Sequence, residues 1–165
     1  MQTGTLILSP EQIELKIQRM AFELWEKNTD VKELYMIGIA GSGQILASLL
    51  AERLRAISKL KVHLEILKIN KERPLENMPE LPWKLDGKSV VLVDDVSNSG
   101  KVLLYTLKPV LDHFPKKIVI AVLVDRRHKA YPINPDIVGY SLSTTLQENI
   151  LVQSDGEKLT GVFLN

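Results

Sequence analysis

Two adjacent carboxylates and a run of small polar residues stand together in the middle of the chain. Asp94 and Asp95 follow the apolar run 89–93, and the segment Ser97–Gly100 leads from them into a helical pattern. Backbone N–H groups and hydroxyls at the start of a helix bind phosphate, while carboxylates accept hydrogen bonds from vicinal hydroxyls. The combination suits a phosphorylated sugar. The alternative is that one Asp caps the helix and the rest is an ordinary turn.

Neither of two common nucleotide-binding motifs explains these residues. A P-loop would need Ser or Thr at position 102, which is Val, and Gly at position 95, which is Asp. A dinucleotide-binding turn would need a third glycine after Gly41 and Gly43, but position 46 is Leu. The segment Ala40–Gly43 nevertheless falls between an apolar run and a helical pattern, so it is a candidate for a second anion site.

The hydrophobic pattern predicts alternating strands and helices that would position these segments. Residues 70–88 hold three prolines and few periodic apolar residues, so they are expected to form a long loop. The runs at 89–93 and 117–124 are apolar throughout, as in strands of a parallel sheet covered by helices on both faces. Strands are expected at 34–39, 62–69, 89–93, 117–124, 136–142, 149–152 and 161–164, and helices at about 10–24, 45–57 and 101–113, the last bent or ended by Pro109.

Three segments that contain polar, charged or glycine residues follow predicted strands: 40–43, 94–100 and 125–129. In an open α/β sheet, ligands bind beyond the carboxyl ends of the strands. These segments are therefore expected to meet at one edge of the sheet and to form one site.

Composition indicates an ordinary soluble domain. The chain has 165 residues, of which 45% are hydrophobic and 25% charged, with a formal net charge of +1, so a single domain spanning 1–165 is expected. The absence of Cys excludes disulfides and thiolate metal sites. No run approaches the ~20 apolar residues of a membrane span, and no signal-peptide pattern is apparent, so a cytoplasmic protein without a membrane partner is expected.

The segment Val90–Lys101 resembles the phosphoribosyl-pyrophosphate (PRPP) signature of type I phosphoribosyltransferases, in which a hydrophobic strand precedes two acidic residues and a small Ser/Thr-Gly loop. Downstream, Ala121–His128 and Pro132–Gly139 are similar to the bifunctional pyrimidine operon regulator and uracil phosphoribosyltransferase family. Ser143–Thr145 falls where that family has a short Pro-Thr-Ser segment. The resemblance covers about residues 10–152. It implies the α/β type I phosphoribosyltransferase fold, with a central, mainly parallel sheet of about five strands flanked by helices, and a small hood from residues 70–88 and the chain ends.

The resemblance also implies an activity and roles for single residues. A protein of this kind transfers the 5-phosphoribosyl group of PRPP to a nucleobase, here with uracil favoured, in nucleotide salvage. Pyrophosphate leaves, Mg²⁺ is held mainly by PRPP with help from Asp94 or Asp95, and the protein is a homodimer or larger homo-oligomer. The implied site residues are Asp94 and Asp95 for catalysis at the ribose, Val96, Ser97, Asn98, Ser99, Gly100 and Lys101 for the 5′-phosphate, Ala40, Gly41, Ser42 and Gly43 for pyrophosphate, and Asp125, Arg126, Ile137 and Val138 for the base.

Three positions depart from the family pattern and keep other functions open. Ser42 stands where the pyrimidine branch usually has an arginine, which removes a bidentate cation. Asn98 replaces an Asp proposed as general base in purine-specific relatives, which disfavours the alternative of a purine phosphoribosyltransferase, and Val102 replaces a hydroxyl residue. The other alternative is an RNA-binding regulator of pyrimidine genes that senses PRPP or nucleotides with weak or no catalysis. Its basic surface would use Lys68, Lys71, Arg73, Lys116 and Lys117.

Overall fold

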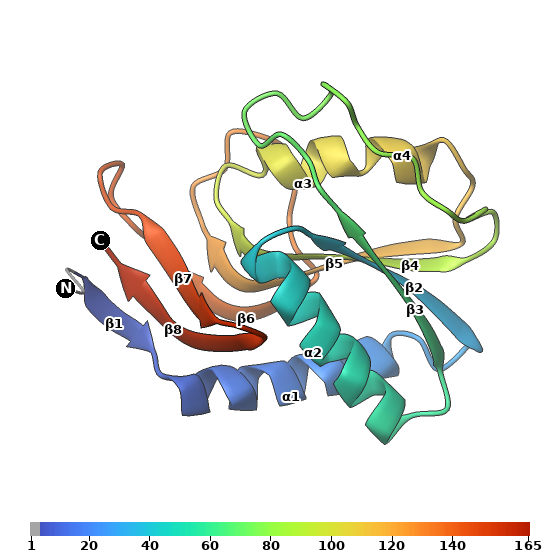
Figure 1. Cartoon of the computed structure of the whole chain (residues 1–165), viewed down its shortest axis with the longest axis horizontal. Coiled ribbons are helices and arrows are strands. Elements are labelled where there is room, and N and C mark those ends of the chain that lie inside the picture. Colours follow the sequence, from blue (N-terminus) through green and yellow to red (C-terminus); the bar gives the residue numbers. More distant parts are fainter. Residues whose placement is uncertain (1–3) are drawn as a thin grey trace.

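The computed structural model describes residues 4–165, which form two sheets and four helices (Figure 1). Five strands make a parallel sheet in the order β3-β2-β4-β5-β6, and three make an antiparallel sheet in the order β1-β8-β7. The elements are β1 (Thr5–Leu8), α1 (Pro10–Glu26), β2 (Glu33–Ile39), α2 (Ser42–Ile57), β3 (Lys61–Leu67), β4 (Ser89–Ser97), α3 (Lys101–Thr106), α4 (Lys108–Leu111), β5 (Lys117–Arg126), β6 (Ile137–Leu142), β7 (Ile150–Asp155) and β8 (Lys158–Leu164).

Helices cover both faces of the parallel sheet, as its apolar strands predict. Val91 and Val93 of β4 belong to the core cluster formed with α1 and α2. Val90 and Leu92, which point to the opposite face because side chains alternate along a strand, belong to a second cluster with α3 and α4. In Figure 1 the helix pairs accordingly lie on opposite sides of the sheet. The predicted α/β fold with a five-stranded parallel sheet is confirmed.

The helix boundaries follow local chemistry. Ser9 caps α1, because its Oγ accepts a hydrogen bond from Gln12 N while its own N–H donates to Gln12 Oε1. The helix predicted over 101–113 is instead two short helices separated at Leu107. Pro109 has no N–H to donate to the preceding turn, which accounts for a break earlier than the predicted late bend.

The two ends of the chain meet in the antiparallel sheet, where Thr5 of β1 pairs with Leu164 of β8. This sheet lies beyond the carboxyl ends of β4 and β5 (Figure 1). Residues 70–88 contain no helix or strand and lie on the other side of the site, against α3 and α4. Lys101 Nζ donates to Glu72 O at 2.6 Å, and Leu85 is buried in the cluster beneath α3 and α4.

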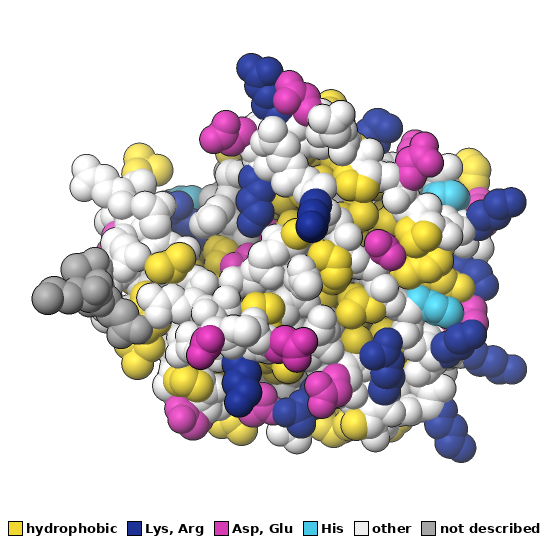
Figure 2. All heavy atoms as spheres, viewed as in Figure 1, with side chains coloured by type: hydrophobic (Ala, Val, Ile, Leu, Met, Phe, Trp, Pro, Cys, Tyr) yellow, Lys and Arg dark blue, Asp and Glu magenta, His cyan; other side chains and the backbone are white. Residues whose placement is uncertain are grey.

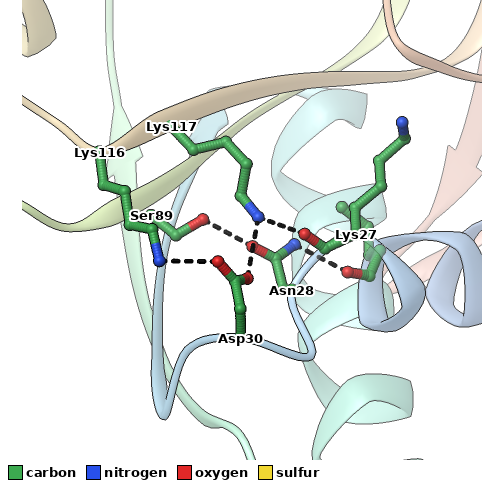
Figure 3. A network of polar contacts seen from close by, with 7 residues as sticks. Lys27, Asn28, Asp30, Ser89, Lys116 and Lys117 are labelled. Atoms are coloured by element: carbon green, nitrogen blue, oxygen red, sulfur yellow. Dashed lines mark hydrogen bonds and ion pairs between the residues drawn. The ribbon is translucent and has the colours of Figure 1, made fainter.

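A polar network joins α1 to the amino-terminal edge of the parallel sheet (Figure 3). Buried Asn28 donates to Leu24 O at 2.7 Å and accepts from Ser89 Oγ at 2.6 Å. Next to it, Asp30 pairs with Lys116 at 2.7 Å and with Lys117 at 3.3 Å. These contacts fix the edge opposite the predicted site. In the described part of the chain, the helices are too short or too polar to span a bilayer.

Candidate functional site

The carboxylate pair lies at the carboxyl end of β4, the central strand of the parallel sheet. Asp94 is only 3% exposed, and its Oδ1 accepts a hydrogen bond from Asp95 N at 2.9 Å. Burial raises the pKa of Asp94 well above its ordinary value, and the neighbouring Asp95 charge raises it further. Asp95 is partly exposed. Such a pair offers one desolvated and one accessible acceptor to a ligand.

The turn between β2 and α2 meets Asp94 through Gly43. A Cβ at position 43 would lie 2.8 Å from Asp94 Oδ1 and 3.2 Å from its Cα, so only glycine allows this approach. Ala40 N extends the β2–β3 pairing by donating to Leu67 O at 2.9 Å. Ser42 Oγ is directed to Val152 O of β7 at 3.4 Å. Both predicted anion-binding turns are therefore brought to the same carboxylate.

The predicted phosphate loop, residues 96–101, surrounds a small cavity next to Asp94. The cavity has a volume of about 80 Å³ and is lined by this loop, Val102 and Leu103, Asp94 and Lys71. Gly100 has φ +84°, and a Cβ there would lie 2.5 Å from Ile133 Cγ2, so the loop packs closely on residues 130–133. The Ser97 hydroxyl is buried without a hydrogen-bond partner among the described residues. A buried hydroxyl in this state is expected where a ligand completes the hydrogen bonding.

The four residues expected to border the base lie at two different levels of the sheet. Asp125 and Arg126 end β5 at the same edge as Asp94, but Ile137 and Val138 do not reach it. They pair with Ala121 and Val122 in the middle of β5, and Ile137 is fully buried in the core. The prediction that they border the base is therefore not supported by the register, which places Ser141 and Leu142 of β6 beside Asp125 and Arg126.

The segment after β6 closes this side of the site. Arg126 donates from its Nη2 to Thr145 O at 2.6 Å, and Thr145 N donates to Glu148 Oε2 at 2.7 Å. The Thr144 hydroxyl and the Arg126 Nε are buried without partners among the described residues. Leu146 is 92% exposed. Residues 143–148 thus bring one unpaired hydroxyl, that of Thr144, and one exposed apolar side chain, that of Leu146, to the side of the site where Arg126 lies.

Two lysines lie in segments that were expected at the site, but the sequence pattern assigned neither of them a role there. Lys71 was expected on a basic surface and within the hood segment 70–88, and it lines the cavity, where its charge acts on Asp94. Lys129, in the turn after β5, donates from its Nζ to Ser97 O, Asn98 O and Arg126 O. The available signal was the position of Lys71 two residues after the predicted strand end at residue 69, since the other site segments also follow strand ends.

The carboxylates fit a Mg²⁺ ion that is shared with a bound ligand. Among residues 4–165 no group of three or more His, Cys, Asp or Glu side chains could enclose a metal. Mg²⁺ in nucleotide sites is commonly held by one or two carboxylates together with phosphate oxygens and water. Asp94 and the partly exposed Asp95, next to a phosphate-sized cavity, provide that donor set.

Comparison with known proteins agrees with this geometry. Residues 5–153 match the phosphoribosyl transferase domain family. A protein named "Bifunctional protein PyrR" from Geobacter sp. (strain M21) is 38% identical, with 99% of each chain covered. Its namesake from Synechocystis sp. is 36% identical, over 88% of this chain and 87% of that protein.

Solved structures show the same fold at low sequence identity. The hypoxanthine phosphoribosyltransferase of Trypanosoma cruzi superposes with a TM-score of 0.79 at 14% identity, covering 98% of this chain and 97% of that one. A hypoxanthine-guanine phosphoribosyltransferase from Bacillus anthracis gives a TM-score of 0.74 at 19% identity, covering 86% and 84%. The family match over most of the chain, the relatives above 30% identity and the shared fold lead to one conclusion: the chain belongs to the type I phosphoribosyltransferase family.

Proposed function

We propose that the protein transfers the 5-phosphoribosyl group of PRPP to uracil, with release of pyrophosphate, in the salvage of pyrimidine nucleotides. The observation that carries the proposal is the place of Asp94, which touches the Gly43 turn on one side and the 96–101 cavity on the other. A ribose lying over Asp94 and Asp95 would have its 5′-phosphate in the cavity and its pyrophosphate against residues 40–43.

The chain's own groups would stabilise the charge that develops at the ribose. Cleavage of the bond between C1 and pyrophosphate leaves positive charge on the ring and negative charge on the leaving group. The carboxylates of Asp94 and Asp95 would accept hydrogen bonds from the 2′- and 3′-hydroxyls and act electrostatically on the ring. Such preorganised groups act strongly in a site that excludes water, and Asp94 is already desolvated.

Mg²⁺, held by the oxygens of PRPP with Asp94 or Asp95, would offset the charge of the departing pyrophosphate. Ser42 supplies no cation to this turn, because its side chain is a neutral hydroxyl, which is directed to Val152 O. Lys71 would supply the protein's positive charge instead, since it lines the neighbouring cavity of residues 96–101 and its charge acts on Asp94, which the 40–43 turn also meets. The charge lost at position 42 would thus be replaced from the segment that follows β3.

Uracil recognition would use the groups around Arg126. Uracil presents two carbonyl oxygens, and the unpaired Arg126 Nε–H and Thr144 hydroxyl are donors that would satisfy them. Ser141 and Leu142 lie level with Asp125 and Arg126 and would border the ring. A purine remains less attractive because Asn98 cannot act as a carboxylate base.

The test is pyrophosphate release from PRPP and Mg²⁺ with uracil, hypoxanthine, guanine, xanthine, adenine and orotate in separate reactions. We expect release with uracil. Pyrophosphate release only with a purine would contradict the proposal that uracil is the substrate. No release with any base, together with no PRPP binding by calorimetry, would contradict the proposed reaction.

One observation favours a second function, a PRPP-sensing regulator that binds RNA. The turn 40–43 carries no cationic side chain, which would slow turnover while leaving the phosphate cavity intact. The five lysines and arginines expected to form one basic surface do not support it, however. Lys116 and Lys117 lie at the amino-terminal edge with Asp30, whereas 68–73 follow the carboxyl end of β3.

Figure 2 shows acidic side chains among the Lys and Arg side chains of the face it displays. Electrostatic RNA binding would weaken steeply as salt is raised. PRPP binding without turnover, together with salt-sensitive binding of a pyrimidine-operon leader RNA, would favour the regulator over the enzyme.

A further inference from the structure

We propose that Lys129 is a positioning residue, which aims the backbone N–H groups of the phosphate loop at the 5′-phosphate by holding the carbonyls on the loop's other side. The inference rests on the proposed function for its ligand. Its basis is the contact between the turn after β5 and the loop after β4, two segments about thirty residues apart in sequence.

The Lys129 ammonium contacts four acceptor oxygens. Its Nζ donates to Ser97 O at 3.0 Å, to Asn98 O at 3.3 Å and to Arg126 O at 2.5 Å, and it pairs with Asp125 Oδ1. The Lys129 and Asp125 side chains are 18% and 12% exposed. An ammonium has only three N–H groups, so one of them is shared and none is left for a ligand.

The next carbonyl of the loop is held by the same turn. Ser99 O accepts hydrogen bonds from Ala130 N and Tyr131 N, both at 3.0 Å. Three consecutive carbonyls, those of Ser97, Asn98 and Ser99, therefore face residues 129–131. Two of the three depend on one side chain.

The planarity of the peptide bond relates the direction of these carbonyls to the direction of the N–H groups that would face the ligand. A trans peptide is planar, and its C=O and N–H point in opposite directions. Fixing the carbonyls of residues 97–99 toward the turn therefore fixes the N–H groups of Asn98, Ser99 and Gly100 away from it. The cavity next to Asp94 is lined by these same three residues. The loop would thus be preorganised for an anion before one binds.

The role of Asp125 changes with this assignment. Its carboxylate is engaged by the Lys129 ammonium, so it would fix that ammonium rather than contact the base directly. A second reading is that Lys129 is present only to neutralise a buried carboxylate. The two readings predict different results when both charges are removed together.

The experiment compares wild type, Lys129→Met, the double variant Asp125→Asn with Lys129→Met, Lys129→Arg, and the exposed control Lys59→Met. Calorimetry measures binding of ribose 5-phosphate, PRPP and free pyrophosphate, and thermal unfolding checks that each variant is folded. We expect Lys129→Met and the double variant to lose about tenfold or more in affinity for ribose 5-phosphate and PRPP, because charge-assisted hydrogen bonds are removed. Pyrophosphate binding should not change, and Lys129→Arg should recover most of the loss.

Wild-type affinity in Lys129→Met, recovery in the double variant, or an equal loss for pyrophosphate would each overturn the inference. Failure of the wild type to bind PRPP would instead count against the proposed function. The inference is then decided without ligand, by ¹⁵N relaxation of residues 98–100. The order parameters of these amides should fall from about 0.85 to below about 0.6 in Lys129→Met, and unchanged values would overturn it.

Discussion

Gly43, in the first turn of α2, is in contact with Asp94, near the end of β4. A Cβ atom on residue 43 would lie 2.8 Å from Asp94 Oδ1. The first turn of α2 and the end of β4 can approach this closely only because residue 43 has no side chain. The two turns proposed to bind anions therefore share this one contact, and a change at Gly43 or Asp94 should act on both.

Gly43→Ala tests this coupling. Alanine is favoured over glycine within a helix by roughly 1 kcal/mol, which should offset part of the strain of the clash, so we expect a folded protein. The Asp94 carboxylate must move, and a displacement of this kind can cost about 100-fold in rate. Pyrophosphate release with uracil measures the loss, and Gln44→Ala, one residue along the same helix, should leave it unchanged. Full activity in Gly43→Ala would contradict the assigned contact.

Removing the buried charge of Asp94 should separate stability from function. The pKa of Asp94 is raised in the folded protein, so between pH 3.8 and that raised pKa the folded state holds more protons than the unfolded state. The free energy of unfolding should therefore decrease as pH rises through this window. Asp94→Asn should lack the decrease and be at least as stable as wild type at pH 7, while losing PRPP binding.

Chemical unfolding at several pH values, alongside calorimetry with PRPP, measures both effects. Asp95→Asn is the informative companion, because it removes the neighbouring charge that adds to the raised pKa of Asp94. It should narrow the pH window rather than abolish it. A variant Asp94→Asn that is less stable than wild type at pH 7 would show that the carboxylate is stabilised by contacts beyond those described.

Lys71→Met should weaken PRPP binding about tenfold or more. A hydrogen bond to a charged group commonly contributes about 1.5–3 kcal/mol, and a loss of about 1.4 kcal/mol already lowers the affinity tenfold. Lys68→Met is the matched control, because Lys68 is exposed in the same segment that follows β3 and does not line the cavity. Titrations with PRPP at two salt concentrations compare them. Equal effects of the two substitutions would remove Lys71 from the site.

Asp30 should control acid stability at the opposite edge of the sheet. Hydrogen bonds from Lys116 and then Lys117 lower the pKa of Asp30 to about 2. A lowered carboxylate pKa contributes stability that is present above the unfolded value of 3.8 and is lost as pH falls toward 2. Asp30→Asn should therefore flatten the decline in unfolding midpoint between these pH values, while exposed Asp155→Asn should not. Catalysis near neutral pH should be unaffected by either substitution.

Much of the fold was predictable because apolar periodicity reports burial directly. The strands around 34–39, 89–93 and 117–124 and the capped helix at Pro10 were found from local patterns. The strand Thr5–Leu8 was not expected, since it is four residues long and depends on a partner at the far end of the chain. Local sequence carries no signal of such a pairing.

In the candidate site, too, features that are local in sequence were predictable, and features that depend on distant segments were not. The carboxylates and the phosphate loop are contiguous in sequence, so their neighbourhood was apparent before the structure. The level of Ile137 and Val138 along the sheet could not be predicted, because the register of β6 on β5 depends on the path of residues 127–136, which no periodicity describes. Segment 125–129 was expected at the site, but the role of Lys129 was not predicted, because its partners are carbonyls of a distant loop and backbone acceptors leave no trace in residue identity.

The antiparallel sheet of the chain ends has a consequence for how the protein is made. Because β1 precedes the other described elements and its pairing partner β8 follows them, their pairing can form only after the strands of the parallel sheet have been synthesised. The parallel sheet and its helices can form from residues 10–142 in the meantime, since domains fold progressively as the chain lengthens. Val152, the acceptor of the Ser42 hydroxyl, belongs to the same late sheet. The antiparallel sheet should therefore join the candidate site only after β8 has been synthesised, when the core of the parallel sheet can already be folded beneath it.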